Sequence, residues 1–260
     1  MIRKRVSIIL IATLVSMLVL GACSKSSEPK YYDKDFMSSL EKGLESRWVF
    51  ADKEEDTENK EFYTTATKKE LEQVKKYEDL KFKDSKLKEA AISYINELKN
   101  GLKVAKTYGS DSFYDNWEKH YDSRTSKLIT INDIKKIEVS EKKQSILDEL
   151  LASGKEVISA EKNKDTLTSF LKSITFAKDE TRSNEFSSYY TATVENTTGL
   201  NIENLNLSFK LIDDNGVTVD TPVEYVENWN AGEKRQLEFW TDKQFSKTEI
   251  TMDEYFKIKE

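Results

Sequence analysis

The chain has 260 residues, of which 41 are Lys or Arg and 47 are Asp or Glu, giving a formal net charge of −6. This acidic balance argues against a nucleic-acid-binding protein, which would present a basic surface to phosphates. One cysteine and one histidine are too few for the common zinc sites, which need two or more such ligands unless carboxylates substitute.

The first 22 residues have the layout of a secretory signal peptide. Arg3, Lys4 and Arg5 precede residues 6–22, an apolar run that contains no charge. The run has 17 residues, against roughly 20 for a helix that crosses the hydrocarbon core. An uncleaved anchor helix is therefore the less favoured alternative.

The residues at the end of this run indicate which kind of signal it is. Leu20, Gly21, Ala22 and Cys23 follow one another, and Leu20 is large for the first place of an ordinary A-x-A-like cleavage site. This tetrad resembles the lipobox of bacterial lipoproteins at all four places. The resemblance implies a diacylglycerol thioether on Cys23, cleavage before it, and a fatty-acylated (palmitate-type) protein on the extracytoplasmic face of the cell membrane. The alternative is a cleaved secretory signal in which Cys23 is incidental.

The mature chain would be more acidic and begin with a tether. Without residues 1–22 it holds 38 basic and 47 acidic residues, a net charge of −9, which disfavours broad adhesion to anionic lipids or wall polymers. If Cys23 is acylated, no thiol remains for a disulfide or for thiolate catalysis. Residues 23–32 are mostly polar and predict a flexible tether.

Residues 33–160 show helical periodicity, which predicts an antiparallel bundle of four or five helices. A helix is expected from Asp33, another after a capping box formed by Thr67 and Glu70, and a third over 85–108 with Gly109 as its stop. Asp111 is expected to cap a fourth. The fifth is expected over 140–153, ended by Gly154, whereas 128–137 is apolar but ambiguous.

Several aromatic residues and the single histidine lie in this helical region. His120, between Lys119 and Tyr121, is predicted to be a surface residue, although a role as a base is the alternative. The aromatic residues at helical spacing are expected to belong to the core, with a ligand groove as the alternative: Trp48, Phe113, Tyr114, Trp117 and Tyr121.

The pattern changes to a period of two in the last third of the chain, so residues 172–260 predict a small antiparallel β-sandwich of five or six strands. The clearest strand is 204–216, where Leu205, Leu207, Phe209 and Leu211 alternate with polar residues before a hairpin turn. Further strands are expected over 187–199, 217–229, 236–240 and 249–258, with 236–240 pairing to the strand before it.

Residues 172–245 resemble the FxLYD domain of exported bacterial proteins. Val194, Asn196 and Thr197 stand where that family has V-x-N-T, and 209–213 stand where it has Phe-x-Leu-Tyr-Asp. Ile212 replaces the family's Tyr. The family's D-x-G turn, Gly-Glu turn and apolar strand match Asp214 to Gly216, Gly232, Glu233, Leu237 and Phe239. The resemblance implies an immunoglobulin-like sandwich and a low-GC Gram-positive source, and it implies no activity.

Motifs for catalysis are scarce. No serine lies in a G-x-S-x-G elbow, and no glycine-rich phosphate loop is present. We therefore expect a non-catalytic membrane-anchored lipoprotein, without cofactor or metal, that serves as an interaction module for an envelope protein or ligand. The alternatives are a solute-capturing lipoprotein of a transporter and a wall-polysaccharide hydrolase that uses two carboxylates.

Overall fold

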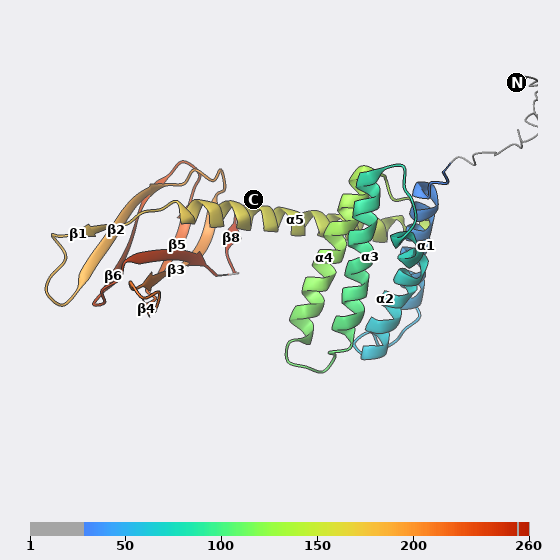
Figure 1. Cartoon of the computed structure of the whole chain (residues 1–260), viewed down its shortest axis with the longest axis horizontal. Coiled ribbons are helices and arrows are strands. Elements are labelled where there is room, and N and C mark those ends of the chain that lie inside the picture. Colours follow the sequence, from blue (N-terminus) through green and yellow to red (C-terminus); the bar gives the residue numbers. More distant parts are fainter. Residues whose placement is uncertain (1–28, 254, 260) are drawn as a thin grey trace, which may run out of the picture. The chain divides into compact units, whose positions relative to one another are not determined.

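The computed structural model describes residues 29–253 and 255–259. Helices occupy the first part of this range and antiparallel strands the last part, so the fold is α+β (Figure 1). The chain divides into two compact units. The first runs up to Phe113 and includes Asp133–Val139, and the second holds Tyr114–Asn132 and Ser140–Glu260.

The first unit is built from three helices that bury one apolar stripe each. They are α1 (Asp33–Ala51), α2 (Lys60–Val74) and α3 (Ser85–Ala105), and α2 packs against both α1 and α3. A 3-10 turn, η1 (Lys75–Glu78), follows α2. The predicted stripe of α1 is confirmed, because Phe36, Leu40, Leu44 and Trp48 are all buried.

The predicted capping box at Thr67 is wrong, because α2 begins seven residues earlier. Asn59 is the N-cap, and its side-chain oxygen accepts a hydrogen bond from the backbone N–H of Phe62 at 2.8 Å. Thr67 is buried in mid-helix, where its hydroxyl donates to the carbonyl of Tyr63. Glu70, one turn later, also faces the interior.

Glu70 joins the three helices of this unit through a buried polar network. Its carboxylate is fully buried, accepts from Arg47 of α1 at 3.2 Å and accepts from the Tyr94 hydroxyl of α3. A buried carboxylate is tolerated only when such partners replace the water that it loses.

The second unit holds most of α4 (Phe113–Ile134) and all of α5 (Gln144–Lys172), which are separated by the 3-10 turn η2 (Glu141–Lys143). The ambiguous segment 128–137 is therefore helical as far as Ile134. The helix predicted over 140–153 is longer than expected, and Gly154 lies inside it rather than at its end. A Cβ at Gly154 would approach the carbonyl oxygen of Thr125 and Cγ1 of Ile129 to 2.8 Å. This glycine lets α5 pack closely on α4 instead of stopping the helix.

Two antiparallel sheets complete the second unit, with more strands than the five or six predicted (Figure 1). One sheet has the order β1–β2–β6, with bounds Ala177–Asp179, Ser188–Glu195 and Lys234–Thr241. In the other, β3 (Ile202–Ile212) is central. It pairs with β4 (Thr218–Asp220), β5 (Val223–Trp229), β7 (Lys247–Met252) and β8 (Lys257–Ile258).

The predicted alternation along β3 is confirmed, and it positions the core of both sheets. Its four odd-numbered apolar side chains, from Leu205 to Leu211, are fully buried. Phe209 stacks on Phe239 of β6 with ring centroids 5.1 Å apart, so the two sheets share one core. Leu167 and Leu171 of α5 belong to the same cluster. Whether this arrangement follows the immunoglobulin-like topology stays a prediction.

One predicted strand pairing is wrong. Residues 236–240 were expected to pair with the preceding strand, but β6 pairs along its whole length with β2. The turn at Gly232, where φ is 76°, therefore carries the chain from one sheet to the other.

Gly154→Ala should lower the free energy of unfolding by about 1–2 kcal/mol, although alanine is the better helix former, because the new methyl group overpacks α4. Urea titration of the full chain measures the change. The control Ser159→Ala, at an exposed site on α5, should stay within about 0.5 kcal/mol of wild type. A gain in stability for Gly154→Ala would contradict the close packing.

Glu70→Ala should cost about 3 kcal/mol of unfolding free energy, because Arg47 and Tyr94 lose their shared acceptor in the protein interior. Glu70→Gln keeps an acceptor and should cost less. Glu72→Ala removes an exposed carboxylate from the same helix and serves as the control. Equal effects at positions 70 and 72 would show that the network does not stabilise the unit.

Candidate functional site

The predicted lipid-attachment site lies outside the described residues. This applies to Cys23 and to the lipobox residues Leu20, Gly21 and Ala22, whereas the last residues of the predicted tether, 29–32, lead directly into α1. Over the described ranges, no helix combines the length and the apolar character that crossing a membrane requires. The same ranges contain no group of three or more His, Cys, Asp or Glu residues placed to hold a metal ion.

The prediction that His120 is a surface residue is wrong. Its exposed fraction is 2%, and its ring lies 5.0 Å from that of Trp117 one turn away on α4. Arg124 and Thr125 are buried on the same helix. The prediction relied on the polar character of residues 119 and 121. Adjacent residues of a helix face different directions, so their character does not indicate where residue 120 points.

The five aromatic residues named as core positions, or alternatively as a groove, differ in burial. Trp48 and Phe113 are buried, which agrees with a role in the core. Phe113 packs edge-on against Tyr63 and Tyr108, with centroids 5.0 Å apart in both pairs. Trp117 and Tyr121 are half-buried. The expected core position is wrong for Tyr114, whose side chain is exposed.

The residues that resemble the FxLYD pattern hold two turns together. Asn196 is buried, and its side-chain amide donates to the carbonyls of Leu200 and Trp229 at 2.9 and 3.1 Å. Its backbone N–H donates to the carbonyl of Glu233. The indole N–H of Trp229 donates to the same carbonyl at 2.9 Å. These contacts tie the β2–β3 turn to the β5–β6 turn, so the conspicuous motif residues are structural.

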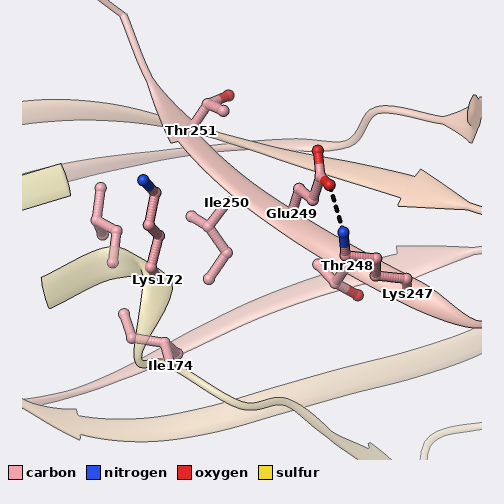
Figure 2. A pocket seen from close by; sticks show the side chains of 8 residues that line it. Lys172, Ile174, Lys247, Thr248, Glu249, Ile250 and Thr251 are labelled. Carbon is pink, nitrogen blue, oxygen red and sulfur yellow. Dashed lines mark hydrogen bonds and ion pairs between the residues drawn. The ribbon is translucent and has the colours of Figure 1, made fainter. Parts of the chain in front are cut away.

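A groove of about 430 Å³ lies between the end of α5 and β7 (Figure 2). On the helix side it is lined by Leu171, Lys172 and Ile174, and on the strand side by five consecutive residues, 247–251. Figure 2 shows the Lys172 and Ile250 side chains opposite each other across it. Successive strand residues point to opposite faces of a sheet. A groove on one face would be lined by every second residue, whereas this groove is lined by five in a row, so it follows the edge of β7.

The groove combines an apolar floor with a basic rim. Ile174 and Ile250 pack against the shared core, and Leu171 belongs to it. Lys247 binds Glu249 at 2.6 Å (Figure 2). The pKa of the Glu249 carboxyl is lowered by that hydrogen bond, by the charge of Lys247 and by Lys210. Within the described chain, Lys172 has no ion-pair partner, and it lies in the last turn of α5, where a cation is favourable.

The hydrogen-bond pattern of β3 shows which backbone groups of β7 face the groove. The N–H of Asp253 donates to the carbonyl of Asn206, which places residues 249, 251 and 253 in the hydrogen-bonded positions toward β3. The N–H and C=O groups of Thr248 and Ile250 therefore point to the opposite edge. In the described part of the chain, β7 pairs with β3 and with no other strand.

Comparison of the chain with protein-family models, with curated proteins and with solved structures finds no match. The resemblance of residues 172–245 to FxLYD domains stays a prediction based on their motif residues.

Sequence reasoning missed the groove. Lys172 and Ile250 carry no recognisable motif, and 161–171 were not assigned to a helix. The one available signal was the strand expected over 249–258, because a final strand in a sheet must have one edge toward solvent or toward another partner.

Lys247→Met should raise the pKa of Glu249 toward the range of an ordinary exposed glutamate, although Lys210 opposite it keeps part of the shift. Because the pKa is lowered in the folded protein, the ion pair contributes at neutral pH and is lost as the pH falls through that folded-state pKa. Carboxyl NMR titration measures the change. Lys234→Met should leave the pKa of Glu249 unchanged, and an equal response to both substitutions would contradict the assignment.

Proposed function

We propose that this chain is a non-catalytic lipoprotein, anchored to the extracytoplasmic face of a bacterial cell membrane, that acts as an interaction module in the envelope. The observation that carries the proposal is the tetrad Leu20-Gly21-Ala22-Cys23 at the end of a charged and then apolar leader. Its partner would be another envelope protein or ligand.

The chemistry of the anchor explains why one cysteine is sufficient. Each buried methylene contributes about 0.8 kcal/mol, a single acyl chain binds a membrane only marginally, and two chains bind stably. A diacylglycerol on the Cys23 sulfur brings two chains to one residue. The mature chain needs no basic patch to reach the membrane, which fits its net negative charge.

The groove beside β7 supports binding rather than hydrolysis. A carboxylate-based glycosidase needs two convergent carboxyl groups about 5–10 Å apart. The groove lining contains one, Glu249, which is engaged by Lys247. An apolar floor with a few polar groups at its rim is the usual character of a binding site.

The strand arrangement gives the transporter alternative no support. Binding proteins of the classical kind have two α/β lobes with parallel sheets. In this chain every strand pairing between described residues is antiparallel. The interaction module is therefore the function that the geometry favours.

Cys23→Ser should abolish acylation, because serine offers no sulfur for the thioether. In a bacterial host that carries the lipoprotein pathway, mass spectrometry of the purified wild-type protein should show a diacylglycerol on Cys23 and cleavage before it. The variant should lack the lipid and either remain unprocessed or leave the membrane fraction after cleavage.

The matched control is Ser24→Ala, which alters the neighbouring residue and keeps the sulfur. It should be lipidated like the wild type. An unmodified Cys23 thiol in the processed wild-type protein, or a cleaved Cys23→Ser protein that stays in the membrane, would overturn the proposed anchor.

A further inference from the structure

We infer that the groove along β7 binds an extended peptide segment of a partner protein, which adds to the β3 sheet as a further strand and places an acidic side chain beside Lys172. This inference rests on the proposed function, because it names the class of partner that an anchored interaction module would recognise. The occupant is recognised mainly by its backbone, and only secondarily by its side chains.

The first support is the set of backbone groups that face the groove. Thr248 and Ile250 each direct one N–H and one C=O away from β3. An added strand would pair with these groups in the way that peptides extend sheets in other proteins. The groove follows five consecutive residues of β7, so its length suits a short extended segment.

A second support comes from comparison with β6, where one edge-facing amide is satisfied within the protein. The odd-numbered residues of β6 form the backbone hydrogen bonds to β2, since the N–H of Asn196 donates to the carbonyl of Glu233. The outward N–H of Glu238 instead donates to the carboxylate of Glu224 on β5 at 3.0 Å. No described side chain makes the corresponding contact with Thr248 or Ile250 of β7. A strand edge with unpaired N–H and C=O groups is a template for pairing with another chain. The groups of Thr248 and Ile250, which are unpaired within the described chain and lie beside a formed groove, therefore point to an external strand.

The third support is charge. The groove region contains Lys172 and Lys247 on its lining and Lys210 directly opposite Glu249 on β3, against the single carboxylate of Glu249. This local positive excess lies in a chain whose mature net charge is negative. An acidic residue in the occupant would pair with Lys172, whereas a basic one would be repelled.

Charge also disfavours a second copy of this chain as the occupant. If two copies paired through their β7 edges, the two grooves would merge, and each would bring its own Lys172 to the junction. Like charges placed together there would oppose association. A heterologous peptide with a carboxylate has no such conflict.

The experiment selects peptides from a phage-displayed library of random nine-residue sequences against the full chain in detergent. Enriched peptides should contain Asp or Glu among alternating β-favouring residues. On binding, the amides of Thr248 and Ile250 should become protected from hydrogen exchange, while amides that already pair with β3 should change little. Selection without enrichment, or protection elsewhere, would overturn the inference.

Two substitutions test the contacts separately. Thr248→Pro removes one outward N–H without removing a bond to β3, which is where an edge strand tolerates proline. Lys172→Glu reverses the rim charge. Each should weaken binding of the selected acidic peptide about tenfold or more, while Lys234→Glu, a charge reversal on β6, should leave binding unchanged.

Circular dichroism and urea titration must show that each variant is folded, and Lys172→Glu remains informative if Thr248→Pro is not. Unchanged affinity in the folded variants would overturn the inference. Concentration-dependent dimerisation that Thr248→Pro abolishes would also overturn it, because the occupant of the groove would then be a second copy of this chain. If the processed wild-type protein binds the peptide but carries no lipid on Cys23, this inference stands and the proposed anchor is overturned. If it carries the lipid but binds no peptide, the anchor alone is retained.

Discussion

The alternation along β3 is the constraint on which the second unit depends. A strand has a period of two for its side chains and for its backbone groups alike. In β3 the odd-numbered side chains enter the core, and the N–H of Phe209 donates toward the β5 side, to Pro222. The backbone N–H and C=O groups of the even-numbered residues point toward β7, as the bond from the N–H of Asp253 to the carbonyl of Asn206 shows. The burial of four apolar side chains thereby fixes which amides of β7 face the groove, and a slip of one residue would reverse both sets.

The sequence was informative where one face of an element carries all the apolar residues. The stripe of α1 and the alternation of β3 could both be predicted, because burial of that face decides the structure. The start of α2 could not. Asn59 and Thr67 are both good capping residues, and only contacts with other helices distinguish them. Once Glu70 binds Arg47 and Tyr94 in the interior, Thr67 must lie in mid-helix.

Other features depended on contacts that have no local signature. Gly154 was predicted to end a helix, yet it lies where α4 packs closely against α5. That close approach involves residues 125 and 129 of α4, which are distant from Gly154 in sequence. His120 has polar and charged neighbours in sequence but is buried in the fold. The groove joins the end of α5 to β7, two segments that are far apart in the chain. A sequence pattern can indicate that a final strand has an edge, but it cannot indicate what lies beside that edge.

An anchored chain and an edge-pairing groove make compatible demands on affinity. Peptide addition to a strand edge uses few side chains, and the peptide loses much conformational freedom when it becomes ordered, so modest affinity is expected. A lipid on Cys23 would hold the groove at the membrane surface, where a partner held there as well is present at a high effective concentration. Weak recognition would then be sufficient, and the length of the 23–32 tether would matter because it sets which partners the groove can reach. A basic rim on an otherwise acidic chain serves the same end, since the net charge limits adhesion to anionic surfaces while Lys172 retains a local attraction for an acidic segment.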